Sequence, residues 1–221
     1  MKSFTLAVFF SLAAIFATQA NAQVVSTSSN GDIAPIVSST DVINGLLPVL
    51  DHDWVGAVNQ INDGVGADVF DENGIDIAGT SPQSGNITLA GTYTFDLDVS
   101  TNTLGYDITS VDVFSSWMDA RAGHDFDLLF STNGGTTFTS VIDDVVNLGS
   151  GEFVQSTISN TSGVLLGTGV TNVQFNVRAG DAVGNGTVFR EIDVFGVPTV
   201  PEPSSMVVLA GFGLALLRRR R

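Results

Sequence analysis

Carboxylates dominate the side chains of this sequence that can do chemistry. Between Gln23 and Val200 there are 22 acidic residues, three arginines and no lysine, which gives a net charge of −19. Most of the acids are Asp, whose short side chain favours turns and oxygen ligation of cations such as Ca²⁺. Two interpretations stay open, a solvated acidic surface or a subset of loops that coordinate calcium. Because this charge repels polyphosphate, we expect no binding to nucleic acid.

Other groups that support catalysis are few. Cysteine is absent, which excludes disulfides and thiolate ligation of zinc or iron–sulfur clusters. His52 and His124 each stand beside an Asp, but no Gly-x-Ser-x-Gly elbow, HExxH motif or phosphate-binding glycine loop accompanies them. Two separated carboxylates would serve a glycosidase, yet abundant acids are no evidence for one. We therefore expect a protein that is not an enzyme.

Two tryptophans and one arginine are the candidates for contact with a ligand. Trp54 and Trp117 have aromatic faces of the kind that stack on the apolar faces of sugar rings. Arg121 lies close to Trp117 in the sequence and has hydrogen-bond donors for sugar hydroxyls. Packing in the core is the alternative role of both tryptophans.

The elements that must position these side chains are strands. Helical periodicity is almost absent between residues 23 and 200. Instead, apolar and polar residues alternate in short segments, which Gly, Asn and Asp residues typical of turns separate. The clearest strand is Thr92–Val99, in which four apolar residues share one face: Tyr93, Phe95, Leu97 and Val99. A turn at Asn133-Gly134-Gly135 supplies the positive φ angles that a hairpin needs.

Further strands are expected over 106–114, 126–130, 136–141, 153–158, 170–177 and 188–195. Seven or eight strands at this spacing predict an all-β fold, an antiparallel β-sandwich in one domain over residues 46–197. Residues 23–45 are rich in Ser and Thr and form either a loose lead-in or a first edge strand.

The first 22 residues have the composition of a secretory signal peptide. Lys2 precedes an apolar run over residues 4–16, expected to be helical, and Ala20-Asn21-Ala22 is a small-x-small cleavage site. The mature chain is then expected to begin at Gln23. A core helix or a membrane anchor is the alternative, but the apolar run is short for spanning a bilayer.

The last residues have the order of a segment that is recognised, held briefly and cut. Pro201-Glu202-Pro203 precedes an apolar run over residues 206–217. The chain then ends with four arginines, Arg218, Arg219, Arg220 and Arg221. The apolar run spans about 18 Å as a helix, well short of the roughly 30 Å hydrocarbon core, so it predicts a marginal transmembrane helix with the arginines on the cytoplasmic side. A permanent tail anchor is the alternative.

Residues 200–221 resemble the PEP-CTERM sorting signal of Gram-negative bacteria, because the tripeptide, the apolar run and the basic end occur together. The resemblance implies removal of the tail by an exosortase-type membrane protease after transient anchoring in the membrane. It also implies delivery to the cell envelope or the extracellular matrix, often in species that make extracellular polysaccharide.

Four segments of the body, taken in order, resemble the discoidin-type galactose-binding-like β-sandwich. They are AVNQINDG at 57–64, YDITSVDV at 106–113, DFDLLFSTNGG at 125–135 and FREIDVFG at 189–196. The resemblance implies a jelly-roll sandwich over residues 46–197, whose loops at one end bind sugars or other surface ligands. Many members of that family also hold a structural calcium ion.

The same resemblance implies where calcium would bind. Asp63 of the early loop and Glu191 of the last strand are the expected ligands, with Asn62 and Asp68 as further ones. Calcium needs about six to eight oxygens, so backbone carbonyls of the 59–68 loop must complete the shell. Otherwise Asp63 is a turn residue and Glu191 the partner of an arginine.

These features predict an exported, non-catalytic protein of the cell envelope or extracellular matrix. We expect it to bind carbohydrate, such as a polysaccharide, or another surface ligand through the loops of the sandwich, with calcium as a stabilising ion. A structural matrix protein with no specific ligand is the alternative, and a hydrolase is a third possibility.

Overall fold

A computed structural model describes residues 23–31, 36–51, 61–64, 91–116, 120–148, 153–178 and 187–201 of the 221-residue chain. Within these ranges the regular elements are strands, apart from a short 3₁₀ turn, η2 (Ala120–Ala122). The strands form two antiparallel sheets, so the predicted all-β sandwich is confirmed. The expected signal helix over residues 1–22 and the expected apolar helix over 206–217 lie outside the described residues.

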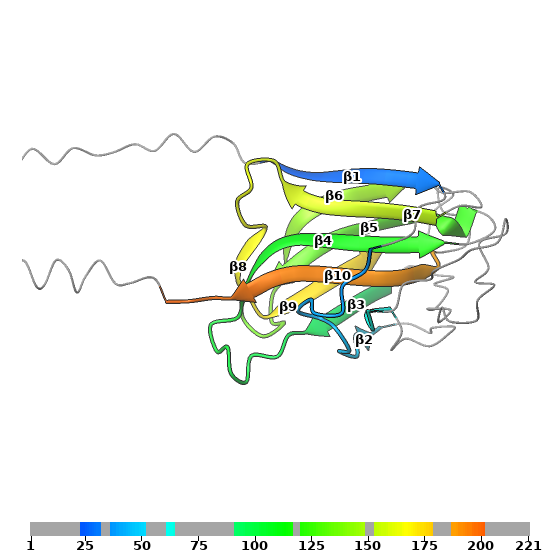
Figure 1. Cartoon of the computed structure of the whole chain (residues 1–221). Helices are drawn as coiled ribbons and strands as arrows, with labels where there is room; N and C mark the ends of the chain where they lie inside the picture. The colour runs from blue at the N-terminus through cyan, green and yellow to red at the C-terminus, as the bar shows by residue number, and fades with distance from the viewer. Residues whose placement is uncertain are drawn as a thin grey trace, which may run out of the picture.

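The two sheets lie face to face (Figure 1). The first has the order β1 (Val24–Gly31), β7 (Phe153–Asn160), β4 (Tyr106–Ser116) and β10 (Phe189–Pro198), and β8 (Gly167–Val170) also pairs with β4. The second has the order β2 (Val49–Leu50), β3 (Gly91–Asp96), β9 (Asn172–Val177), β5 (His124–Ser131) and β6 (Thr139–Asn147). The chain changes sheet between β3 and β4 and again between β4 and β5, as a sandwich requires.

The core lies between the inner faces of the sheets. Tyr93, Phe95 and Leu97 are buried together, as their alternation with polar residues predicts. The ring of Phe175 meets the rings of Phe95 and Phe126 edge-on, with centroids 6.2 and 5.5 Å apart. Because such aromatic pairs add to the stabilisation from burial, this cluster anchors β3, β9 and β5 to one another.

β3 ends earlier and β6 begins later than the sequence pattern predicts. β3 ends at Asp96 rather than at Val99, since the carboxylate of Asp98 accepts a hydrogen bond of 3.0 Å from Ser100 N and turns the chain. β6 begins at Thr139 rather than at residue 136, since the side chain of Asn133 binds Thr137 through both its oxygen and its nitrogen. In both places a local side-chain bond replaces ladder hydrogen bonds.

The N-terminal segment begins with an edge strand. β1 pairs with β7 over its whole length, from Val24 opposite Asn160 to Gly31 opposite Phe153. β1 begins and β10 ends at the same end of the sandwich, as Figure 1 shows. Both routes out of the fold therefore leave from one end.

Candidate cation site and ligand pocket

The first six residues of β10 are buried on both faces of the strand. The six residues Phe189–Val194 are all buried, although alternate side chains of a strand point to opposite faces. Ile192 and Val194 belong to the core, so Glu191 and Asp193 point to the outer face of the sheet. Segments 36–46 and 61–64 cover β10 along its free edge, where Val42 N donates to Val194 O at 2.9 Å and Ile192 N donates to Ile61 O at 2.6 Å.

Each of the two buried carboxylates accepts a hydrogen bond from the covering segments. Gly64 N donates to Glu191 Oε1 at 3.0 Å, and Ser38 N donates to Asp193 Oδ2 at 2.8 Å. The second oxygens, Glu191 Oε2 and Asp193 Oδ1, are buried and have no hydrogen-bond partner. A buried carboxylate oxygen without a donor is costly unless it carries a proton or meets a cation.

Three further side chains at the site also have a buried oxygen without a hydrogen-bond partner. Asp112 of β4 lies directly opposite Asp193 in the ladder. Asp41 Oδ1 accepts hydrogen bonds from Ile43 N at 3.0 Å and from Val194 N at 3.2 Å. The remaining oxygens without a hydrogen-bond partner are Asp41 Oδ2, Asp112 Oδ1 and Asn62 Oδ1. Acceptors thus outnumber donors on this face of β10.

This arrangement favours protonated carboxyls. Burial, together with the charges of Asp193, Asp63 and Asp41, raises the pKa of Glu191 from 4.5 to about 9 against the opposing hydrogen bond from Gly64. Burial and the charges of Asp41 and Asp112 raise the pKa of Asp193 to about 7. Burial also raises the pKa values of Asp41 and Asp112. At neutral pH the Glu191 carboxyl therefore holds a proton unless a cation replaces it.

The fit of this site to a metal ion is partial. Among the described residues, no three His, Asp or Glu side chains converge as ligands of one ion. A calcium ion here would have to take Glu191 together with backbone and amide oxygens, as in the shells of six to eight oxygens that calcium forms. The open oxygens of Glu191 and Asn62 are of the right chemical type for such a shell.

The structure places part of the predicted site. Asp63 is close enough to Glu191 to raise the pKa of its carboxyl, and Gly64 joins the same loop to it. The amide nitrogen of Asn62 donates to Ile43 O and, at 2.8 Å, to Leu46 O, so this side chain also ties the loop together.

The other predicted residues fall outside what the structure describes. Trp54, Trp117 and Asp68 lie outside the described residues, as do Ala20, Ala22, Glu202, Pro203 and Arg218, Arg219, Arg220 and Arg221. The backbone of Arg121 belongs to η2, but its side chain is not described. Pro201 is exposed, three residues beyond the end of β10.

The sequence pattern alone did not indicate Asp41, Asp112 and Asp193 as members of the cluster. Asp193 had a detectable signal, since it follows Glu191 by two residues in a strand and so shares its face. Asp112 required the pairing of β4 with β10, and Asp41 lies 153 residues from the Val194 amide that it binds. No local pattern reports contacts of that kind.

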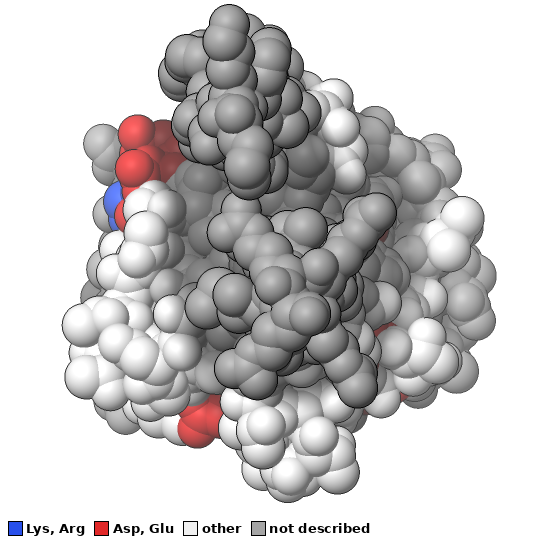
Figure 2. All heavy atoms as spheres, turned by 90° about the vertical axis from the view of Figure 1, so that its left-hand side faces the viewer, with Lys and Arg blue, Asp and Glu red and all other residues white. Residues whose placement is uncertain are grey.

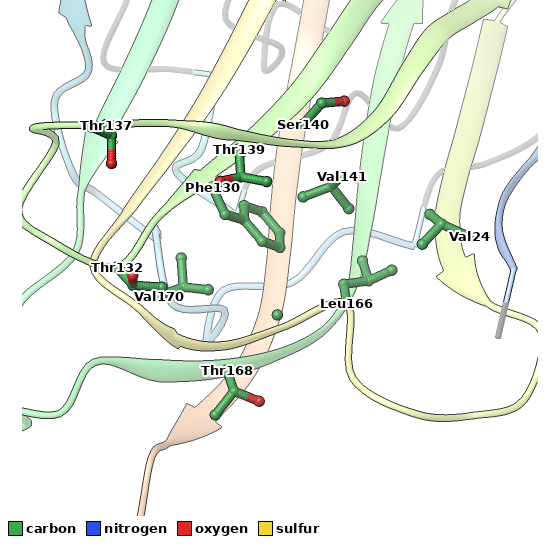
Figure 3. A pocket seen from close by; sticks show the side chains of 11 residues that line it. Val24, Phe130, Thr132, Thr137, Thr139, Ser140, Val141, Leu166, Thr168 and Val170 are labelled. Carbon is green, nitrogen blue, oxygen red and sulfur yellow. The ribbon is translucent and has the colours of Figure 1, made fainter. Parts of the chain in front are cut away.

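A second candidate site is a half-open pocket of about 300 Å³ near the end of the sandwich at which the chain termini lie. Figure 3 shows the side chains that line it. They come from β1, β5, β6, β8 and the neighbouring turns: Val24, Phe130, Thr132, Thr137, Thr139, Ser140, Val141, Leu166, Gly167, Thr168 and Val170. None of them is charged, although the protein is strongly acidic.

The pocket combines an apolar floor with hydroxyl groups. Phe130, Leu166 and Val170 supply the floor, and five Thr and Ser side chains supply the hydroxyls. Gly167 is required for this shape, because a Cβ atom at this position would lie 2.7 Å from the Phe130 ring. This mixture of apolar surface and a few polar groups is typical of sites for small ligands.

His124 is placed for structure rather than for contact with a substrate. Its side chain is fully buried, with Nδ1 3.0 Å from Ser115 Oγ and Nε2 2.5 Å from Ser156 Oγ. Because the Ser115 hydroxyl donates to Ala122 O, it accepts from Nδ1–H, and Nε2 then accepts from Ser156. Burial lowers the pKa of His124 to about 3, so the ring is neutral.

The fold and these sites define a β-sandwich with a covered carboxylate cluster and a hydroxyl-lined pocket. Residues 199–221 match the family of the PEP-CTERM protein-sorting motif, so the expected sorting signal is confirmed. A search of curated proteins found no match to the chain. The protein is therefore exported, associates with the membrane and is sorted to the cell envelope through exosortase processing. No helix among the described residues is long and apolar enough to cross a bilayer.

Proposed function

We propose that this exported protein is a non-catalytic carbohydrate-binding module of the cell envelope or extracellular matrix, with a neutral glycan as its ligand. The observation that carries the proposal is the uncharged pocket with an apolar floor and a set of hydroxyls. The C–H faces of a sugar ring pack on Phe130 and Leu166, and the Thr and Ser hydroxyls exchange hydrogen bonds with the sugar hydroxyls.

The charge of the protein favours a neutral glycan over an acidic one. A body with a net charge of −19 repels uronate or sulfate groups, and the pocket lining contains no Arg, Lys or His to offset this repulsion. The buried, neutral state of His124 supports a role without catalysis, since this ring has no access to a substrate. Binding at the cell surface agrees with the sorting motif.

The test is calorimetry against neutral oligosaccharides chosen from a glycan array. Thr139→Val and Thr168→Val each remove one hydroxyl from the pocket at nearly constant volume. We expect each to weaken binding by roughly five- to tenfold, because that change in affinity corresponds to the net free energy of about one hydrogen bond. Thr101→Val, an exposed threonine outside the pocket, is the matched control. Equal binding by the wild-type protein and the three variants, or no binding by the wild-type protein, rejects the proposal.

The proposal includes a calcium ion at Glu191. An ion bound by Glu191 together with oxygens of the loop around Asn62 and Asp63 would replace the proton of this carboxyl and fix the loop on β10. The open Glu191 Oε2 atom supports this assignment. We expect calcium to raise the melting temperature, Glu191→Gln to abolish the rise and the exposed control Asp98→Asn to preserve it.

A structural matrix protein is the second candidate, favoured by the high acidic charge. It predicts many weak cation sites that salt screens, rather than one saturable site. A calcium response that falls steadily with ionic strength and survives Glu191→Gln would favour this function over the first.

A further inference from the structure

The chain leaves the fold from a firmly held point. Thr199 N donates to Gly105 O at 2.9 Å, and Thr199 Oγ1 donates to Asp107 Oδ1 at 2.6 Å. Gly169 N donates to the same hydroxyl at 3.2 Å. The backbone is thus fixed to the loop before β4 and to β8 as far as residue 199, where the sorting motif begins.

Exposed apolar side chains gather at this end of the sandwich. They are Leu104 (47% exposed), Val164 (51%), Leu165 (38%), Val197 (57%) and Val200 (73%), which we call the tether-end patch. The ladder places them near one another, because Val170 of β8 and Pro198 of β10 both lie opposite Tyr106, two residues after Leu104. Leu166 N also donates to Ile108 O at 2.7 Å, which holds the loop of Val164 and Leu165 against β4.

The same end has few charges. Segments 99–106, 160–171 and 194–201 contain no Asp, Glu, Lys or Arg, and neither does the turn over residues 131–142. Figure 2 looks onto this end, and among the described residues acidic atoms occupy only a few places on it. Asp98 lies beside the patch, because its backbone carbonyl accepts a hydrogen bond of 2.8 Å from the Tyr106 hydroxyl, and the Asp107 carboxylate accepts one from Thr199. An uncharged face with five exposed apolar side chains is unusual in a body with a charge of −19.

The short connection to the tail brings this face close to a membrane. Only residues 200–205 separate Thr199 from the apolar run that begins at Met206. Fully extended, six residues reach at most about 22 Å. When the apolar run is in the bilayer, the patch is therefore held at high effective concentration next to the lipid surface, so weak apolar contacts are sufficient to dock it.

We propose that the tether-end patch is the membrane-facing surface of the protein while its sorting tail is in the bilayer, with the opposite end of the sandwich directed away from the lipid. The occupant of the patch is the lipid surface, since the described chain leaves the fold at residues 199–201 beside the patch and the apolar run follows within six residues. This goes beyond glycan binding, which the pocket at the same end would take up once the tail is removed, and the two proposals can fail separately.

The absence of cysteine makes the orientation directly measurable. Val164→Cys places a fluorophore on the patch, and Leu148→Cys, also more than half exposed and just after the far end of β6, is the matched control. The full chain is reconstituted into phosphatidylcholine vesicles that contain headgroup-nitroxide lipid. We expect the nitroxide to quench most of the fluorescence at position 164 and little at position 148.

A patch variant checks that the patch itself docks. Leu104→Ser with Leu165→Ser leaves the core intact, and we expect it to lose most of the quenching at position 164 with an unchanged melting temperature. Equal quenching at both labelled positions, or quenching that the patch variant retains in full, overturns the proposal. A signal that depends on protein concentration and not on nitroxide lipid would show that a second copy covers the patch, and also overturns it.

Discussion

Glu191 links the pH of the medium to the stability of the fold. Its pKa is raised from 4.5 to about 9 on folding, so the folded state holds a proton that the unfolded state has released. The stability from this group is complete below pH 4.5 and is lost as the pH rises toward 9. Asp193, with a pKa raised to about 7, contributes in the same direction over a lower range.

We predict that, in the absence of calcium, the free energy of unfolding falls between pH 7.5 and 9 by up to about 1.4 kcal/mol per pH unit. Glu191→Gln should remove most of this slope, because glutamine has no proton to lose. Urea unfolding at a series of pH values measures the effect, and the exposed control Asp98→Asn should retain the slope. A flat wild-type curve would contradict the raised pKa of Glu191.

His124 has the opposite dependence on pH. Its pKa is lowered from 6.5 to about 3, so between these pH values the ring is protonated in the unfolded state and neutral in the folded state. The stability from this neutral ring is present above pH 6.5 and is lost as the pH falls to 3. Below pH 4.5, where Glu191 is protonated in both states, this loss is no longer offset by Glu191.

We predict that the free energy of unfolding falls by up to about 1.4 kcal/mol per pH unit as the pH is lowered from 4.5 to 3. His124→Gln should reduce this slope. NMR offers a second measurement on the wild-type protein. The imidazole shifts of His124 should stay constant from pH 8 to 4. An inflection near pH 6.5 would show that the ring is accessible to solvent and would contradict the structure.

At the scale of elements, the loop over β10 depends on one glycine. Gly64 has a φ of +72°, and a Cβ atom there would lie 2.6 Å from Ser39 Cα. Its amide is also the donor to Glu191. Gly45 lies in the covering segment with almost the same φ, +71°, but has open space around it.

We therefore predict different costs for the same change at the two positions. Gly45→Ala should cost about 1–2 kcal/mol of unfolding free energy, the usual penalty for a left-handed residue with a Cβ. Gly64→Ala should cost clearly more, since it adds a backbone clash and displaces the Glu191 donor. Chemical denaturation of both variants measures the difference, and equal costs would show that the loop adapts to the added atom.

At the scale of the whole molecule, the fold is complete before the tail begins. Thr199 is the last residue with described hydrogen bonds, and the apolar run starts at Met206. Removal of the tail after the Pro-Glu-Pro tripeptide thus leaves every described strand and every described core residue in place. We expect the processed protein to keep the melting temperature of the unprocessed one.

Processing itself gives a prediction for intact mass. In a host with an exosortase, the protein should lose the apolar run and the four arginines, because the tail matches the motif that this system processes. Replacement of Pro201, Glu202 and Pro203 by alanine should leave the tail in place, whereas Val200→Ala should not. Retention of the tail in the wild-type protein would identify it as a permanent anchor.

The sequence by itself determined the strands and the sorting tail. Alternation placed Tyr93, Phe95 and Leu97 on one buried face, and the linear order of tripeptide, apolar run and arginines identified the tail. Both are local signals, since neighbouring residues in a chain carry them. The ends of β3 and β6 were misjudged because Asp98 and Asn133 replace ladder bonds with side-chain bonds.

Only the tertiary structure decided which residues meet. Gly64 and Glu191 are 127 residues apart, and Ser38 and Asp193 are 155 apart. The pocket likewise combines residues of four strands and the turns beside them, and the tether-end patch combines two loops with the end of β10 and the residues after it. Such groups arise from the register of paired strands and from the segments that fold over β10. The free energy that selects this register comes from packing of the whole core, which no short stretch of sequence reports.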